Sequence, residues 1–302
     1  MLSLQKEEKN SNVEKYVEDS PRTVAVKCRG ASHIKANKPC QDAFLVRTIK
    51  EGSAILLSVS DGHGGDKYDL SEKGAEFAAK VSLDIIESYK PYYYSVPDMI
   101  DIFNNNFPRR IVTSWHERVI EDIKSSDMPF YEKNKENPRL IYQRYGCTLV
   151  TALITEGKIY ICQIGDGDAM IVFDDGSIEY PIPEPIGLVG GETHSMSSED
   201  SIRLWISKTV TINGKGMIIL STDGLSNSFE SKDEVNKFNK SLYENMKNYN
   251  VVNIADSLEG WIQKASENGS GDDITLVASI FGDESEDDSL SKSSESVEKR
   301  KE

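Results

Sequence analysis

Residues 54–66 read AILLSVSDGHGGD. The first half is short, aliphatic and bounded by turn-forming residues, which predicts a buried β-strand. The strand ends at Asp61, and three glycines follow within four residues. Because glycine lacks a Cβ atom, the backbone here can approach a ligand closely, with the imidazole of His63 beside the carboxylate. The segment is therefore a candidate site, although Asp61-Gly62 taken alone also fits an ordinary hairpin turn.

The size and charge of the chain limit what it can do. Its 302 residues can bury a large core, and we expect one domain with frayed ends. With 35 basic and 50 acidic residues the net charge is −15, which disfavours nucleic acid and anionic membranes as partners. No apolar run suits a signal peptide or a membrane span, so we expect a soluble cytoplasmic protein. Its widely spaced cysteines favour reduced thiols.

Hydrophobic periodicity predicts a mixed α and β chain. Short apolar or alternating runs predict strands over 23–28, 43–49, 54–60, 148–155, 158–164, 169–173, 209–212, 217–220 and 274–280. Helical spacing predicts helices over 71–89, 97–124, 231–247 and 251–267, the second interrupted at Pro108. Residues 30–39 and 125–140 are expected to be polar connections.

The same pattern divides the chain into three parts. Residues 1–20 are polar and are expected to form a flexible N-terminal segment. Residues 21–281 are expected to form the folded domain, with a long irregular surface excursion over 181–208. Residues 282–302 are charged, serine-rich and without periodicity, which predicts a disordered tail.

Four carboxylates stand at strand ends. Asp61, Asp166 and Asp223 each precede a glycine after an apolar run, and Asp272 comes just before another run. If the strands pack as antiparallel sheets these ends can converge, and the carboxylates then repel one another unless cations hold them. Oxygen ligands without a Cys/His cluster indicate Mg²⁺ or Mn²⁺ rather than structural zinc. Two such ions can activate water and clamp a phosphoryl group, which is the chemistry of phosphate-ester hydrolysis.

Several segments, in a fixed order, resemble the metal-dependent protein serine/threonine phosphatases, the protein phosphatase 2C family. The resemblance covers roughly residues 22–281, and the opening 30–42 is most similar to a bacterial subgroup. It implies an α+β fold, a four-layer α/β/β/α sandwich of two antiparallel sheets flanked by helices. The matching segments are Gln41-Asp42-Ala43-Phe44, Ser60-Asp61-Gly62-His63-Gly64-Gly65, Gly146-Cys147-Thr148-Leu149, Ile164-Gly165-Asp166, Ser221-Thr222-Asp223-Gly224 and Gly271-Asp272-Asp273-Ile274-Thr275.

The resemblance also implies a role for each matching residue. Asp61 would bridge two Mn²⁺ or Mg²⁺ ions, and the Gly62 carbonyl would bind the second ion. Asp223 and Asp272 would bind the first ion, and Asp42 would act on the ions through waters.

The remaining roles concern proton transfer and a third ion. Asp166 would help Asp223 hold a third, weaker ion. His63 would protonate the leaving seryl or threonyl oxygen, a task suited to a group whose ordinary pKa is about 6.5.

The chain departs from the family pattern around the phosphate. Many relatives have an arginine five residues before Asp42, where this chain has Asn37. We expect His33 and Lys35 to bind phosphate in its place. The family's usual Gly-Asp-Ser-Arg ends here in Asp168, and 181–208, where the family has a variable flap, lacks the common pattern. These departures predict unusual substrate choice.

The leading hypothesis is a metal-dependent protein phosphatase. It would hydrolyse phosphoserine and phosphothreonine by attack of a metal-bridging water or hydroxide, with a phosphorylated protein as substrate and an opposing serine/threonine kinase as a further partner. The alternative is a pseudophosphatase, a regulatory binding module with little or no turnover, which the missing arginine favours. A calcium-stabilised binding domain also fits the carboxylates but gives His63 no role.

Overall fold

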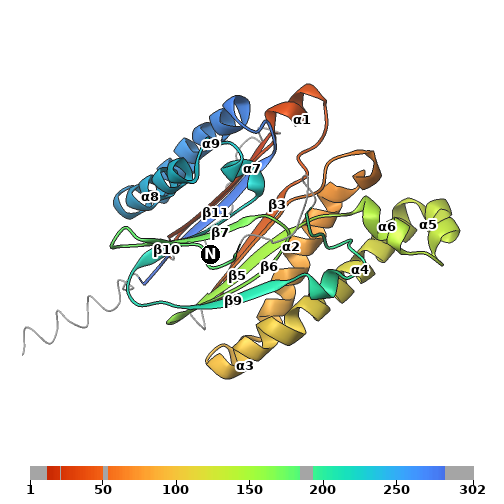
Figure 1. The fold of residues 1–302 in the computed structure, drawn as a ribbon, viewed down its shortest axis with the longest axis horizontal. Coiled ribbons are helices and arrows are strands. Elements are labelled where there is room, and N and C mark those ends of the chain that lie inside the picture. The colour runs from red at the N-terminus through yellow and green to blue at the C-terminus, as the bar shows by residue number, and fades with distance from the viewer. Residues whose placement is uncertain (1–11, 21, 50–53, 184–192, 283–302) are drawn as a thin grey trace, which may run out of the picture.

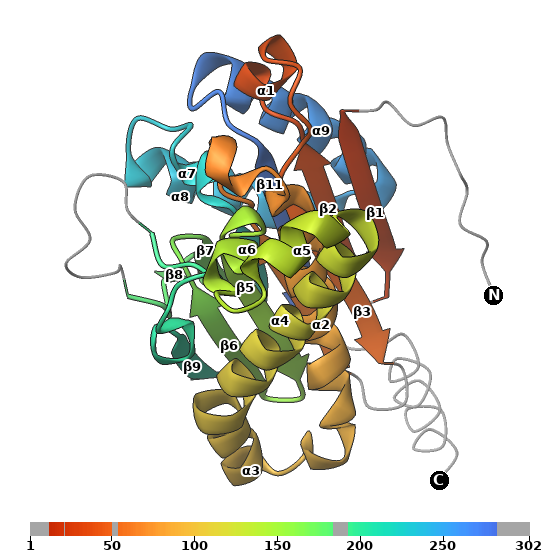
Figure 2. The ribbon, with the colours of Figure 1, turned by 90° about the vertical axis from the view of Figure 1, so that its right-hand side faces the viewer.

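Two antiparallel sheets lie face to face in the computed structural model, with helices on both outer sides (Figures 1 and 2). The structure describes residues 12–20, 22–49, 54–183 and 193–282. The six-stranded sheet has the order β1 (Val13–Asp19), β2 (Arg22–Cys28), β11 (Ile274–Phe281), β10 (Gly216–Ser221), β7 (Asp168–Phe173) and β8 (Ile178–Glu179). The five-stranded sheet has the order β3 (Ala43–Ile49), β4 (Ala54–Ser60), β5 (Leu149–Thr155), β6 (Lys158–Ile164) and β9 (Ile206–Thr211).

Helices cover the outer face of each sheet. The pair α8 (Lys232–Asn248) and α9 (Val251–Asn268) packs on the six-stranded sheet, and α2 (Ser71–Ser88) with α4 (Phe107–Ser126) covers the other. Shorter helices are α1 (Ala31–Lys35), α3 (Val96–Asp101), α5 (Met128–Asn134), α6 (Arg139–Arg144) and α7 (Asp223–Ser226). The predicted α/β/β/α sandwich is thereby confirmed.

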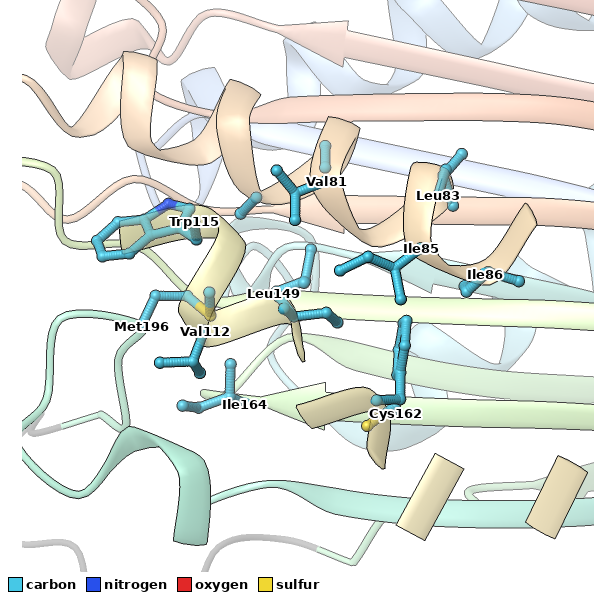
Figure 3. Close-up of a cluster of buried hydrophobic side chains, with 14 of the residues drawn as sticks. Val81, Leu83, Ile85, Ile86, Val112, Trp115, Leu149, Cys162, Ile164 and Met196 are labelled. Atoms are coloured by element: carbon cyan, nitrogen blue, oxygen red, sulfur yellow. The ribbon is translucent and has the colours of Figure 1, made fainter. Parts of the chain in front are cut away.

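Three apolar layers hold the sandwich together. One lies between the sheets, one under α8 and α9, and one under α2 and α4. In the last, Trp115 of α4 is fully buried, and its indole N–H donates to the Gly74 carbonyl of α2 at 2.9 Å. Figure 3 shows Trp115 and Val112 beside Met196, which comes from the chain preceding β9. This packing holds the segment around Met196 against α4.

The two predicted polar connections contain helices. Residues 30–39 include α1, and 125–140 includes α5 and the start of α6. These helices are too short to show a repeating apolar face, and α5 is started instead by the Asp127 side chain, which accepts the Phe130 N–H at 3.1 Å. The predicted interruption lies just before Pro108 rather than at it: a π-helical turn over Ile102–Asn106 separates α3 from α4, and Pro108 lies in the first turn of α4, where a proline is tolerated.

The prediction of a flexible N-terminal segment over 1–20 is wrong for Val13–Asp19. These residues form β1, paired along its whole length with β2. Most of its side chains are polar, so the strand is held by backbone pairing and by Lys15, whose Nζ lies 2.7 Å from Asp256 and 2.9 Å from Glu259 of α9. Residues 1–11 and the predicted tail over 283–302 lie outside the described residues.

The predicted surface excursion over 181–208 is only partly irregular. Its residues 184–192 lie outside the described part of the chain. Beyond them, Ser195 and Met196 are buried, a 3₁₀ turn spans Ser201–Arg203, and β9 begins at Ile206. The prediction that this segment lies at the surface is therefore wrong for Met196, which enters the core.

Two further properties of the described residues concern the cysteines and the membrane. The four cysteines are free thiols. Among the described residues, no helix combines the length and the apolar character that a membrane crossing needs.

Candidate active site

The sandwich brings the predicted carboxylates together at one edge. Asp61 follows β4 of one sheet, while Asp223 follows β10 and Asp272 precedes β11 of the other. Burial raises the pKa of Asp61 well above its ordinary value, and the negative charges of Asp42, Asp223 and Asp272 raise it further. Asp42, Asp223 and Asp272 therefore lie within electrostatic reach of Asp61.

Asp61 is fixed through its backbone. Its N–H donates to Thr148 Oγ1 at 3.1 Å, and its carbonyl accepts the Thr148 N–H at 2.8 Å. The next residues continue this pairing, since Gly62 bridges Cys147 and the His63 N–H donates to the Gly146 carbonyl at 3.0 Å. The chain therefore does not fold back at Asp61-Gly62, and the hairpin-turn interpretation is wrong.

Asp42 is 1% exposed. It accepts the Thr222 hydroxyl at 3.0 Å, so it is tied to the residue just before Asp223. Burial raises the pKa of Asp42 well above its ordinary value, and the charge of Asp273 adds to this. Asp42 is therefore one of the crowded carboxylates, and its ionised form is disfavoured unless a cation lies nearby.

Asp166 and Asp223 form the other flank of the site. Burial raises the pKa of Asp223 to about 6, and the charge of Asp166 contributes next. The loop carrying Asp166 is held by Gln163, whose amide donates to the Gly165 carbonyl at 3.2 Å and to the Gly167 carbonyl at 2.6 Å. The structure therefore brings Asp166 within electrostatic reach of Asp223.

His63 lies next to the carboxylates against a tight wall. Its ring packs edge-on to Tyr68 with the centroids 5.0 Å apart. A Cβ atom at Gly146 would come within 2.9 Å of both His63 Cδ2 and Ser197 Oγ. Burial lowers the pKa of His63 to about 4, opposed by the charge of Asp166. The expectation of an ordinary pKa does not hold in this environment, which favours the neutral imidazole.

Of the two predicted phosphate-binding residues, the structure places only His33 against the site. His33 Nδ1 lies 2.8 Å from Asp273 Oδ2, and this contact, with the charges of Asp273 and Asp272, raises the pKa of His33. Lys35 is exposed, and no contact among the described residues ties it to the site. Asn37 has φ of 51°, a left-handed conformation that asparagine adopts more readily than arginine.

Asp273 is the residue that sequence reasoning missed. It is 3% exposed and accepts the N–H groups of Gly30 and Gln41, each at 2.6 Å, besides facing His33. It thereby clamps α1 and the start of β3 onto the strand that follows Asp272. The adjacent pair Asp272-Asp273 was the sequence feature that could have indicated it. In the structure Asp272 is exposed and Asp273 is buried.

The donor set fits a hard divalent cation. Within the described residues, no group of three or more Asp, Glu, His or Cys side chains already surrounds a common point. However, carboxylates are crowded around Asp61, and like charges in one place are relieved by bound cations or by protons. Carboxylate and carbonyl oxygens suit Mg²⁺ and Mn²⁺. Asp61, Gly62, Asp223 and Asp272 are therefore chemically suited to hold such ions.

Comparison with known proteins agrees with this description. The family model of protein phosphatase 2C matches residues 29–263. The chain is 23% identical over 207 residues to serine/threonine-protein phosphatase 3 of Escherichia coli (strain K12), covering 68% of this chain and 73% of that protein. The chain belongs to the protein phosphatase 2C family.

Solved structures show the same fold. Serine/threonine phosphatase Stp1 from Staphylococcus aureus matches with a TM-score of 0.58 and 18% identity, over 92% of this chain and 100% of that one. The catalytic domain of the serine/threonine protein phosphatase PstP, solved with 2 manganese ions, matches with a TM-score of 0.52 and 16% identity, over 86% and 97%.

Close packing at Gly62 gives a direct test of the site's rigidity. A Cβ atom there would lie 2.5 Å from the Gln41 carbonyl oxygen and 2.8 Å from that of Ser71, whereas one at Gly64 would meet nothing within 4 Å. Gly62→Ala should therefore lower the free energy of unfolding by about 1–3 kcal/mol, measured by urea denaturation. Gly64→Ala is the matched control and should change it by less than about 0.5 kcal/mol. Equal effects would show that the backbone at Gly62 is not closely packed.

Proposed function

We propose that this chain is a metal-dependent phosphatase that hydrolyses phosphoserine and phosphothreonine in protein substrates. The crowding of Asp42, Asp61, Asp223 and Asp272 is the observation that carries the proposal, because crowded carboxylates favour the binding of cations. Family membership supports the same reaction, since the curated relative is a serine/threonine-protein phosphatase.

Each carboxylate has a proposed part in holding the ions. Asp61, the Gly62 carbonyl, Asp223 and Asp272 would hold two ions. Asp42, tied to Thr222, would act on them through waters, and Asp166 would join Asp223 in holding a third ion. When bound, Mn²⁺ or Mg²⁺ supplies the Lewis acidity that activates water and neutralises charge on the phosphoryl group.

His63 is the proposed proton donor to the leaving oxygen. Burial favours its neutral form, while the carboxylate of Asp166 favours the charged form. A bound phosphate dianion adds a second negative charge near the ring and so favours the protonated imidazole when substrate is present. The wall made by Gly146 and Ser197 keeps the ring in place.

His33 is the proposed substitute for the arginine of other family members. Its contact with Asp273 orients the imidazole and favours its protonated form, in which it acts as a single cationic donor rather than a planar fork. Lys35, on the same helix, is exposed and contributes less to phosphate binding.

Replacing Asp223 with Asn tests the metal proposal. Mn²⁺-dependent hydrolysis of a phosphothreonine peptide should fall by about 100-fold or more, because a charged ligand is lost. The folded-state pKa of Asp223 is raised, so its ionised form destabilises the metal-free fold above that pKa. Metal-free Asp223→Asn should therefore unfold at a higher temperature than wild type at pH 7, but not at pH 4.

The control for this variant is Asp98→Asn, an exposed change in α3 that should alter neither property. Full activity in Asp223→Asn would remove the proposed ion-binding role of this residue. Wild-type protein that binds Mn²⁺ but shows no turnover would instead support the pseudophosphatase alternative.

His63→Gln separates acid catalysis from scaffolding. A serine alkoxide needs a proton as it leaves, whereas nitrophenolate leaves with little help. The variant should therefore hydrolyse a phosphoserine peptide roughly 10²–10⁴-fold more slowly, and p-nitrophenyl phosphate much less so. Equal losses on both substrates would show that His63 only positions the Asp61 loop.

His33→Ala and Lys35→Ala form a matched pair on α1. His33→Ala should raise KM for the phosphopeptide more than it lowers kcat, because it removes a phosphate contact. Lys35→Ala should raise KM by a smaller factor. Unchanged KM in His33→Ala would leave the phosphate held by the ions alone, with His33 acting only in the Asp273 contact.

A further inference from the structure

A cavity of about 310 Å³ lies between α4 and residues 199–203. Arg109, Thr113 and His116 line it from α4, and Ser201 and Arg203 line it from the 3₁₀ turn. None of these residues belongs to the proposed catalytic machinery. The volume falls at the lower end of the range of small-molecule pockets.

Two unpaired cations stand out in this cavity. In a chain of net charge −15, Arg47, Arg118, Arg139 and Arg144 each pair with a carboxylate. The side chains of Arg109 and Arg203 make no ion pair or hydrogen bond to any residue that the structure describes. Glu199 and Asp200 also line the cavity, but Glu199 is already paired with Arg139 at 2.6 Å. The unpaired charge in the lining is therefore positive on balance.

The other walls are neutral. The His116 ring stacks on Tyr142 with the centroids 3.7 Å apart and the planes at 12°. Burial lowers the pKa of His116 to about 4, so near pH 7 it is a neutral donor or acceptor. Val112 and Ile202 add apolar surface. Guanidinium groups beside an apolar wall suit a carboxylate or phosphate carried on an apolar body.

We propose that this cavity binds a small organic anion, a carboxylate or a phosphate, through Arg109 and Arg203. Such a ligand would contact Glu199–Arg203, which directly follow the segment that supports His63. Met196 of that segment packs beside Val112 and Trp115 (Figure 3), and Ser197 lies against Gly146 beside His63. Occupation of the cavity therefore changes phosphopeptide turnover. This effect on turnover rests on the proposed function, whereas the binding of the anion is independent of it.

Calorimetric titration of the full chain tests the binding. The probes are benzene-1,3-dicarboxylate and phenylphosphonate, with neutral benzene-1,3-dicarboxamide for comparison. At least one anion should bind and the amide should not. Arg109→Gln and Arg203→Gln should each weaken that binding about tenfold or more, while Arg118→Gln, on the same helix and paired with Glu121, should leave it unchanged.

The results separate the two parts of the proposal. The anion whose affinity falls in both cavity variants identifies the ligand class. Absence of binding by either anion, or affinity unchanged in Arg109→Gln and Arg203→Gln, would overturn the site. If binding follows the arginines but phosphopeptide turnover is the same with and without the anion, the link to His63 is wrong. A protein without turnover would contradict the proposed function and leave the binding result standing.

Discussion

Repulsion among crowded carboxylates is the constraint on which the rest of the structure depends. Asp61 is surrounded by the charges of Asp42, Asp223 and Asp272, an arrangement that costs free energy without cations. It persists because hydrogen bonds to Thr148 on both sides of the Asp61 backbone leave it no freedom to move away. The packing of the two sheets therefore offsets the cost of a site whose charge is relieved by protons or by bound cations.

The surroundings of the cluster are organised to serve this site. Buried Asp273 clamps the backbone at Gly30 and Gln41, which fixes α1 with His33 and the start of β3 with Asp42. On the opposite side, the segment around Ser197 supports His63. The α1 segment and the segment around Ser197 both lie outside the regular strands. Substrate preference in this chain is therefore expected to depend on these two segments rather than on the strands.

The strands, the helices and the carboxylates at strand ends could be predicted from local patterns, whereas the four-layer arrangement came from the family resemblance. Strand ends at Asp61 and Asp223 are visible as apolar runs closed by Asp-Gly, and stacking of the sheets brings them together. Contacts between residues distant in the sequence leave no local pattern, so they could not be predicted. The polar strand β1 is held by backbone pairing, Met196 is buried by α4, and the clamp at Asp273 depends on amides more than 200 residues earlier in the chain. The role assigned to Lys35 came from its closeness to His33 in the sequence. Residues two apart on a helix point in different directions, so Lys35 need not face the site as His33 does.

The most direct test of this account is the thermal unfolding midpoint as Mn²⁺ is added at pH 7, for wild type and for Asp61→Asn. A ligand that binds only the folded state raises its stability with concentration. Cations that relieve the repulsion around Asp61 should therefore raise the wild-type midpoint progressively, with little or no rise in Asp61→Asn. A wild-type midpoint that does not respond to Mn²⁺, or an equal rise in both proteins, would contradict the claim that this cluster is built to hold metal ions.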